Sequence, residues 1–318
     1  MIISWEDFRN LKGYSLIGWS VFLGSRKIGV IILITFLIAC KTNRTTLPLK
    51  VDGKIPQTEG LEIVLRENDG DIIEFDVSSD SNLLVYSTNA YRSVFQVFLM
   101  NFKENKKQYL LPENVEQHSP TLVDSNVYFV RIDKGISHIT CYDIKNNTTK
   151  TIFQINNLVL KLASDKMSSN LDRLGFAVKD KGLWRIWVFD NNKFIFIDDG
   201  FAPFLAGDYI YFQKPNLKGE NFYSIYAYDL SNRAKYSIIS DTNKSYINPS
   251  VSKNTSFISF VEFSNSNYFL KLMDLKTRRV YTLFESSTPI LSPNLNVEGY
   301  IYFLWRDNGQ FAVYRKRI

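Results

Sequence analysis

The stretch HSPTLVDSNVYFVRIDKGISHITCYDIKNNTTKTIFQI, from His118 to Ile155, contains four short apolar runs separated by polar turns. The first run follows a proline, the second is VYFVRI, the third is ITCYD with Asp143 at its end, and the fourth is KTIFQI. Val, Ile, Tyr, Phe and Thr dominate these runs, and such β-branched and aromatic residues favour strands. The stretch therefore predicts four consecutive strands that form one small antiparallel sheet.

The same pattern recurs from Phe75 to the end of the chain. Further proline-containing starts are FAPFL, INPSV and TPILSP, and further third runs that end in Asp are IWVFD, IYAYD and LKLMD. The corresponding third-run positions are separated by intervals of 42, 47, 39 and 45 residues and are Asn101, Asp143, Asp190, Asp229 and Asp274. Four strands in roughly 40–45 residues are typical of β-propeller blades, which stack face to face.

The length of the repeat region indicates the number of blades. The 258 residues from Leu61 to Ile318 give 43 per blade for six blades, whereas five blades would need about 52 and seven about 37. The last copy stops at its third strand, and LEIVLRE (Leu61 to Glu67) stands alone before the first copy. We therefore predict an all-β chain that forms a six-bladed β-propeller of four-stranded antiparallel blades, closed by the N-terminal strand.

These repeats resemble the TolB-like six-bladed propeller family. LSPNLNVEGYIYF (Leu291 to Phe303) is similar to the start of that family's blades, and YDLSNRAKYSII (Tyr228 to Ile239) is similar to their second half. The resemblance covers the whole predicted propeller and implies its fold. The namesake of the family also has an N-terminal α/β domain, for which residues 41–60 leave no room, so membership in its envelope complex is not implied. Blades one and three are degenerate copies, because their starts at Phe75 and Leu160 lack the proline.

The N-terminal region has the features of a secreted lipoprotein. Arg26 and Lys27 precede the apolar run from Ile28 to Ala39, which is short for a membrane span but suits a signal peptide. The sequence LIAC, ending at Cys40, resembles the bacterial lipobox. This resemblance implies that Cys40 carries a diacylglyceryl thioether and becomes the new N-terminus after cleavage. The alternative is an uncleaved signal anchor with an unmodified cysteine.

We accordingly expect three segments, namely a signal peptide at 1–39, a lipidated cysteine and tether at 40–60, and the propeller at 61–318. The region before the apolar run of a bacterial signal peptide is normally short, and residues 1–24 make it long here. Either the start codon has been placed too early, or a longer membrane segment begins near Tyr14. Lys41 directly follows Cys40, and a residue other than Asp at this position resembles the enterobacterial pattern that permits transport of a lipoprotein to the outer membrane. We expect a bacterial envelope protein, held to the membrane by N-terminal acyl chains and facing the periplasm or the cell exterior, with the outer membrane favoured.

The sequence contains no recognisable catalytic motif. With Cys40 acylated, only Cys141 remains, which excludes an intrachain disulfide and a cysteine metal cluster. His118 and His138 are the only histidines and lack metal-ligand spacing, and the sequence has no GxSxG, phosphate loop or CxxC. The formal net charge of +6 is spread along the chain rather than clustered. We therefore predict no catalytic residue, no metal, no cofactor, no nucleic-acid partner and a monomeric propeller.

The acidic residues have structural interpretations. An Asp at the end of each third run is expected to cap the following turn through its side-chain oxygens. Asp198 and Asp199 are adjacent, and neighbours on a strand point to opposite faces, so we interpret them as turn residues rather than as a catalytic pair.

We expect binding at the loops that join second to third strands and one blade to the next, because binding residues concentrate on such loops. These loops are the longer ones here and contain Trp and Arg, which are common interface anchors. The predicted partner-binding residues are Lys134, Trp184, Arg185, Lys214, Lys218, Phe222, Trp305 and Arg306. We therefore predict a lipid-anchored, non-catalytic envelope module that binds a protein partner or a ligand through this propeller face. The alternative is a glycan-acting or other propeller enzyme with carboxylates at the channel mouth, and an acidic cluster in the channel would favour it.

Overall fold

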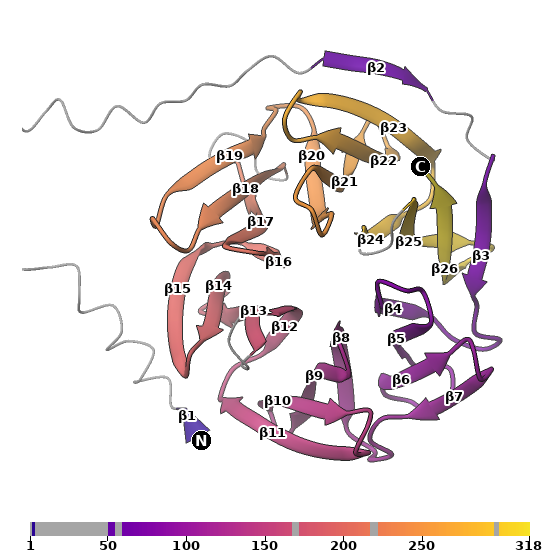
Figure 1. Ribbon diagram of the computed structural model, residues 1–318, viewed down its shortest axis with the longest axis vertical. Helices are drawn as coiled ribbons and strands as arrows, with labels where there is room; N and C mark the ends of the chain where they lie inside the picture. The colour runs from indigo at the N-terminus through magenta and orange to yellow at the C-terminus, as the bar shows by residue number, and fades with distance from the viewer. Residues whose placement is uncertain (1, 4–49, 55–58, 167–171, 217–221, 296–298) are drawn as a thin grey trace, which may run out of the picture.

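The structure, a computed structural model of the 318-residue chain, describes residues 2–3, 50–54, 59–166, 172–216, 222–295 and 299–318. Six antiparallel sheets stand around a central axis as the blades of a β-propeller (Figure 1). The described residues form strands and turns and contain no helix, so no helix among them could cross a membrane. The predicted all-β, six-bladed fold is confirmed.

The blades are named A to F in chain order, and each consists of four consecutive strands except the last. Blade A contains β4 (Ile72–Val77), β5 (Leu83–Thr88), β6 (Gln96–Asn101) and β7 (Lys106–Tyr109). Blade B contains β8 (Glu116–Val123), β9 (Asn126–Asp133), β10 (Ile136–Asp143) and β11 (Thr148–Ile155). Blade C contains β12 (Val159–Lys166), β13 (Asp172–Asp180), β14 (Leu183–Asp190) and β15 (Lys193–Asp199). Blade D contains β16 (Phe201–Ala206), β17 (Tyr209–Pro215), β18 (Tyr223–Asp229) and β19 (Lys235–Ile239). Blade E contains β20 (Ser245–Val251), β21 (Phe257–Ser264), β22 (Asn267–Asp274) and β23 (Arg279–Ser286).

Blade F joins the two ends of the propeller. It contains β24 (Ile290–Asn294), β25 (Tyr300–Asp307), β26 (Gln310–Arg317) and, as its outer strand, β3 (Leu61–Leu65). β3 runs antiparallel to β26, with Leu65 opposite Val313 (Figure 1). The predicted closure by the N-terminal strand is therefore confirmed.

Two short N-terminal strands extend the outer edges of other blades. β1 (Ile2–Ile3) pairs in parallel with β11, and β2 (Lys50–Lys54) pairs in parallel with β23. Lys50 lies opposite Arg279, and Lys54 lies opposite Thr282. Five residues of the expected tether thus form a strand on the outside of blade E (Figure 1).

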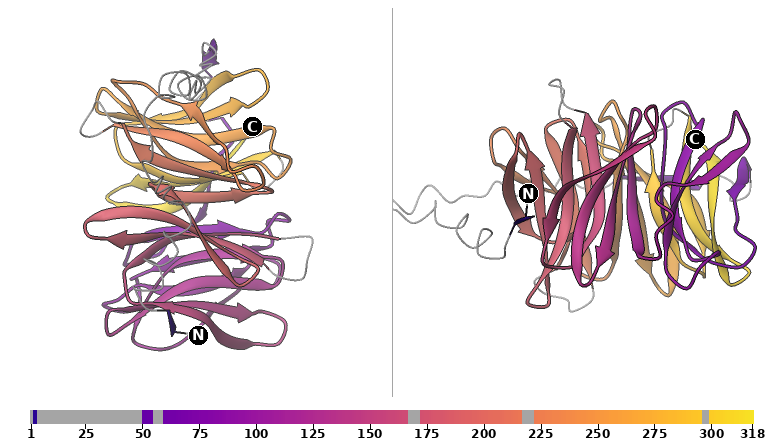
Figure 2. Two further views of the ribbon diagram at one scale, coloured as in Figure 1. Left: turned by 90° about the vertical axis from the view of Figure 1, so that its left-hand side faces the viewer. Right: turned by 90° about the horizontal axis from the view of Figure 1, so that it is seen from below.

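The strand order gives the propeller two different faces. Successive turns of an antiparallel sheet lie at opposite ends of its strands, as the side views show (Figure 2). We call the end with the first-to-second and third-to-fourth turns the turn face. We call the end with the second-to-third turns and the links between blades the loop face.

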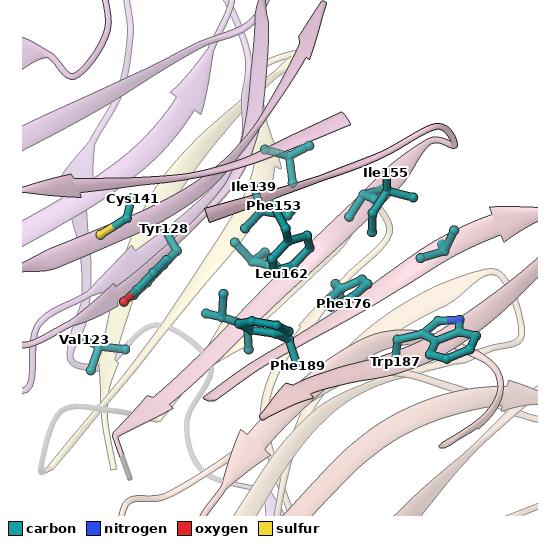
Figure 3. Close-up of a cluster of buried hydrophobic side chains, with 14 residues drawn as sticks. Val123, Tyr128, Ile139, Cys141, Phe153, Ile155, Leu162, Phe176, Trp187 and Phe189 are labelled. Atoms are coloured by element: carbon teal, nitrogen blue, oxygen red, sulfur yellow. The ribbon is translucent and has the colours of Figure 1, made fainter. Parts of the chain in front are cut away.

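Apolar side chains fill the spaces between neighbouring blades. In the cluster between blades B and C, the Phe153 ring lies 4.8 Å from Phe189 and 5.6 Å from Phe176, measured between centroids (Figure 3). Trp187 is 1% exposed at the same interface. Each fully buried side chain of this size contributes about 1.5–3 kcal/mol, so stacking of blades is the main source of stability.

The recurrent prolines lie within β-bulges of the innermost strands. The register shifts in all six inner strands, and five of the bulges contain a residue with positive φ, namely Ser119, Lys161, Ala202, Asn248 and Ser292. Proline follows four of these residues, the exception being the Lys161 bulge. A bulge accommodates proline because the bulged residue leaves the hydrogen-bond ladder. Blade A, which lacks the proline, also lacks the positive-φ residue in its bulge.

The turn-capping prediction holds for three of the four Asp residues. Asp143, Asp229 and Asp274 each accept hydrogen bonds from two backbone amides of the turn that follows. These bonds help to lower the pKa of all three carboxyl groups. Asp190 instead pairs with the Arg173 guanidinium at 3.2 Å.

Candidate functional site

A cavity of about 920 Å³, lined by both polar and apolar side chains, lies on the propeller axis. All six inner strands line it, from the bulges to the turns that follow them, so it opens at the turn face. The lining includes Glu74, Asp76, Ser119, Lys161, Asp165, Asn248, Lys253 and Asn294. The sequence did not reveal this cavity, because its walls come from six segments that are separated by a whole blade each.

Asp76, on β4, joins three blades within the cavity wall. Its Oδ2 accepts hydrogen bonds from the Leu122 amide at 2.7 Å and the Thr121 hydroxyl at 3.1 Å, both from blade B. Its Oδ1 accepts from the Asn294 side chain of blade F at 2.6 Å and from the Val77 amide at 2.8 Å. Burial raises the pKa of Asp76, and these donors oppose part of that rise.

Glu74 lies two residues earlier on the same strand and connects blades A, B and C. It accepts hydrogen bonds from the amide and hydroxyl of Ser119, at 2.5 and 3.1 Å, and forms an ion pair with Lys161 at 2.9 Å. Burial favours protonation of Glu74, but Lys161, His118 and the Ser119 amide outweigh it and lower the pKa of Glu74. Burial lowers the pKa of the neighbouring His118.

Further hydrogen bonds connect the remaining blades around the cavity. The Thr121 hydroxyl lies 2.8 Å from that of Ser164, and the Gly207 amide donates to Asp165 at 2.7 Å. Two more bonds complete the circle, from the Asn248 amide to Gln213 at 2.8 Å and from the Leu295 amide to Ser250 at 3.1 Å. Every blade interface therefore has a polar link as well as an apolar core. The buried carboxylates are engaged in this assembly.

The described residues contain no group of three His, Cys, Asp or Glu side chains arranged to hold a metal ion. Cys141 is buried and forms no disulfide. Asp198 and Asp199 lie at the end of β15, so their interpretation as turn residues is wrong. They take different partners, because Asp198 pairs with Lys214 and Lys235, whereas Asp199 lies 3.5 Å from Arg185.

Several predicted partner-binding residues make contacts within the propeller. The Trp184 ring lies 4.8 Å from Phe201 of the next blade. Arg185 pairs with Asp180, and Lys214 pairs with Asp198 at 2.7 Å. Each of these side chains is only partly exposed. Trp184 and Lys214 contact a neighbouring blade, whereas Arg185 pairs within blade C.

The other predicted residues that the structure describes are distributed over three blades, B, D and F. The Trp305 indole donates to the hydroxyls of Ser286 and Thr288 at 3.0 and 2.9 Å. Arg306 and Lys134 are exposed, and Phe222 is half-buried. The structure therefore places the described members of the set on the loop face, but at separate positions. Lys218 and Cys40 lie outside the described residues.

The loop-face connections also contain exposed large apolar side chains that the sequence analysis did not select. Leu183 is 55% exposed beside Trp184, and Tyr91, Leu158 and Phe263 are also exposed. Tyr91 lies between β5 and β6, Leu158 lies between blades B and C, and Phe263 lies near the end of β21. The sequence did contain a signal for the exposure of Leu183. The glycine-containing turn directly before it places this leucine at the end of a strand, where side chains are more exposed.

The fold defines a closed six-bladed β-propeller with a cavity on its axis. Its fold is TolB-like. TolB from Acinetobacter baumannii matches with a TM-score of 0.61 at 15% identity, over 76% of this chain and 65% of that chain. This chain thus spans just under two thirds of that TolB.

Enzyme propellers have the same fold. An oligogalacturonate lyase from Vibrio parahaemolyticus matches with a TM-score of 0.54 at 10% identity, over 84% of this chain and 96% of that chain. The propeller domain of the Trilobed protease from Pyrococcus furiosus matches with a TM-score of 0.52 at 12% identity, over 80% of this chain and 96% of that chain. No protein-family model and no curated protein matches the sequence. At these identities the similarities establish the fold alone.

Proposed function

We propose that this chain is a non-catalytic binding module of the bacterial envelope, anchored through lipid on Cys40, whose loop face binds a protein partner. The observation that carries the proposal is the exposure of Leu183, Tyr91, Leu158 and Phe263 on loop-face connections of three blades. These side chains are exposed at one end of the propeller, and exposed apolar side chains are contact residues in protein interfaces when a partner covers them together. The exposed Lys134 and Arg306 add cations at the same end.

The chemistry of the cavity supports binding rather than catalysis. General acid–base catalysis requires a carboxyl or imidazole group that can reach the substrate. Glu74 and Asp76 are instead engaged by donors from neighbouring blades, and replacing those donors with substrate would break the contacts between blades. A binding module needs only a rigid scaffold, which these contacts supply.

The alternative is a glycan-acting enzyme, and two observations favour it. Five carboxyl groups line the cavity, namely Glu74, Asp76, Asp80, Asp124 and Asp165, and this is the acidic cluster that the sequence analysis associated with an enzyme. Asp76 is a buried carboxyl group with a raised pKa in the wall of this cavity, and perturbed carboxyl groups in cavities are common in active sites. If the chain is such an enzyme, it should release reducing ends or unsaturated products from a panel of oligosaccharides. Asp76→Asn should then abolish this release in a variant that remains folded.

The binding proposal is tested by crosslinking the acylated protein in its own membranes and comparing two variants. Leu183→Ser changes a loop-face side chain that is 55% exposed, and Ile63→Ser changes an outer-strand side chain that is 57% exposed. We expect Leu183→Ser to lower recovery of the crosslinked partner roughly tenfold, a typical effect of an interface anchor, and Ile63→Ser to leave it unchanged. Equal recovery with both variants would show that the loop face is not the interface.

A further inference from the structure

The turn face carries exposed cations on every blade. They occupy the third-to-fourth turns, or in blade F the end of β26, and comprise Lys103, Lys106, Lys145, Lys193, Arg233, Lys276, Arg279 and Arg317. The carboxylates in three of these turns, Asp143, Asp229 and Asp274, accept hydrogen bonds from their own backbone amides. The exposed Asp80 and Asp124 lie nearer the axis, where they line the cavity. Glu59, Glu104 and Asp208 are exposed carboxylates at the same end, so the excess of cations is clearest on blade E, where Lys253, Lys276, Arg278 and Arg279 face a single carboxylate, Asp274.

Five exposed cations lie on three consecutive blades and form what we call the basic patch. These are Arg233 of blade D, Lys253, Lys276 and Arg279 of blade E, and Arg317 of blade F. Arg278, in the same turn as Lys276, is half-buried and donates to the Ile238 carbonyl of blade D, which holds the turn against its neighbour. The position of the patch is thus fixed by the blade interface.

The N-terminal tether reaches the propeller beside this patch. β2 runs parallel to β23 and begins with Lys50 opposite Arg279, at the turn-face end of blade E. Cys40 is ten residues before Lys50, so the intervening chain spans at most about 35 Å. A strand of eight residues, such as β21, is about 26 Å long. A lipid on Cys40 therefore reaches a membrane at the turn face easily, whereas a membrane at the loop face would require most of that length.

From this geometry we infer that the basic patch lies against anionic lipid headgroups of the membrane that holds the Cys40 anchor. This inference rests on the proposed acylation of Cys40. Lys and Arg near an anionic bilayer each contribute favourable energy, and a lipid chain combined with a basic surface anchors more firmly than either alone. The orientation leaves the apolar loop face directed away from the membrane, toward a partner.

A pair of cysteine variants at the two ends of β21 measures the orientation. Ser256→Cys places a thiol in the β20–β21 turn on the turn face, and Ser266→Cys places one in the β21–β22 turn on the loop face. Both serines are exposed, whereas Cys141 is buried and acylation blocks Cys40. Each full-length acylated variant is labelled with a fluorophore and reconstituted in vesicles that carry a headgroup quencher. One set of vesicles is phosphatidylcholine, and the other is equal parts phosphatidylcholine and phosphatidylglycerol.

On the anionic vesicles we expect several-fold stronger quenching of the Ser256→Cys label than of the Ser266→Cys label, and a smaller difference on phosphatidylcholine. Equal quenching of the two labels on anionic vesicles would overturn the inference. So would the same preference on both kinds of vesicle, because the tether alone would then set the orientation.

Charge reversal identifies the responsible surface. The double variant Lys276→Glu with Arg279→Glu should abolish the quenching preference on anionic vesicles. The double variant Lys179→Glu with Lys181→Glu changes the net charge equally on the loop face, at residues outside the predicted partner-binding set, and should leave the preference intact. A wild-type protein that reacts with the fluorophore at Cys40 would disprove the anchor itself, whereas an unreactive, vesicle-bound protein with no preference would disprove only the orientation.

Discussion

Arg66 and Glu67 are consecutive in the chain, yet they pair with opposite sides of the seam that closes the propeller. Arg66 forms an ion pair with Asp307 of blade F at 2.7 Å. Glu67 forms an ion pair with Lys107 of blade A at 2.8 Å and accepts hydrogen bonds from Tyr86 and Tyr91. Immediately after the closing strand β3, the two residues hold the last blade to the first.

Glu67 and its partners Lys107, Tyr86 and Tyr91 form what we call the Glu67 cluster, and even a conservative substitution of Glu67 should lower the stability of the propeller. Glu67→Gln removes the charge that balances Lys107 and weakens two tyrosine hydrogen bonds at a side chain that is 3% exposed. We expect a loss of about 2–3 kcal/mol in the free energy of unfolding, measured by urea denaturation.

The matched control for Glu67→Gln lies five residues earlier. Glu62→Gln breaks an exposed pair with Arg315 and should cost less than about 1 kcal/mol. Similar losses for the two variants would contradict a special role of Glu67 at the seam.

Removal of the closing strand should destabilise the whole propeller. Deletion of residues 61–67 removes β3, exposes one edge of β26 and uncovers the core that Val64 and Leu65 help to cover. These side chains are half-buried and Ile63 is exposed, so the apolar loss is about 1 kcal/mol for each covered side chain. The lost hydrogen bonds and the Glu67 cluster raise the total to several kcal/mol. Thermal melts should show a much lower midpoint than deletion of residues 42–49, and equal midpoints would mean that β3 does not close the ring.

The cavity carboxylates predict different effects for identical substitutions. Asp76→Asn replaces one carboxylate oxygen with an NH₂ group, which then faces the donors of either blade B or blade F, and should cost about 2–4 kcal/mol. Asp80→Asn changes an exposed residue that bonds within its own turn, to Ser78 and Asn82, and should cost about 1 kcal/mol or less. The comparison needs only chemical denaturation, and a tolerated Asp76→Asn would show that these bonds do not hold the blades.

The Glu74–Lys161 pair predicts a pH dependence of stability. Because the folded pKa of Glu74 is lowered from its ordinary value of 4.5, its stabilising effect is full above that pH and is lost as the pH falls through the lowered value. The stability difference between wild type and Glu74→Gln should therefore be constant near neutral pH and shrink below about pH 4. A difference that grew on acidification would have the wrong sign. The exposed Glu104→Gln serves as the control.

The proposed anchor predicts how the protein partitions. Wild type should enter the detergent phase and remain with membranes in high salt, because two or more acyl chains give stable attachment at about 0.8 kcal/mol per buried CH₂. Cys40→Ser should remain uncleaved and lack lipid, which mass spectrometry and labelled fatty acid would detect. Salt-extractable wild type with an unmodified Cys40 would refute the anchor.

The repeats in the sequence were sufficient to predict the fold, because each blade repeats the same local signals. The lone run Leu61 to Leu65 identified the closing strand for the same reason. β2 was missed because its sequence, KVDGK, contains a glycine and two lysines and does not have the composition of a strand. Its pairing with β23 depends on a contact more than 200 residues away in the chain.

The candidate site was less predictable than the fold. The partners of Asp76 lie 45 and 218 residues away, so no local spacing connects them. The sequence also favoured Trp184 as an anchor, although its ring packs at a tilt against Phe201, whereas its neighbour Leu183 is the more exposed. Which of two adjacent strand-end residues faces solvent depends on how the next blade packs, and that information is not local.

The position of β3 also determines when the fold can be completed. Arg66 and Tyr314, which share a hydrogen bond across the seam, are separated by 248 residues. During synthesis β3 emerges before any blade, and its partner β26 emerges after all the other described strands, so blade F remains incomplete until β26 is made. A chain that is cut short retains an unpaired strand edge, and such edges attract other chains and proteases. Closure by β3 thus delays completion of the ring until β26 has been synthesised and can pair with it.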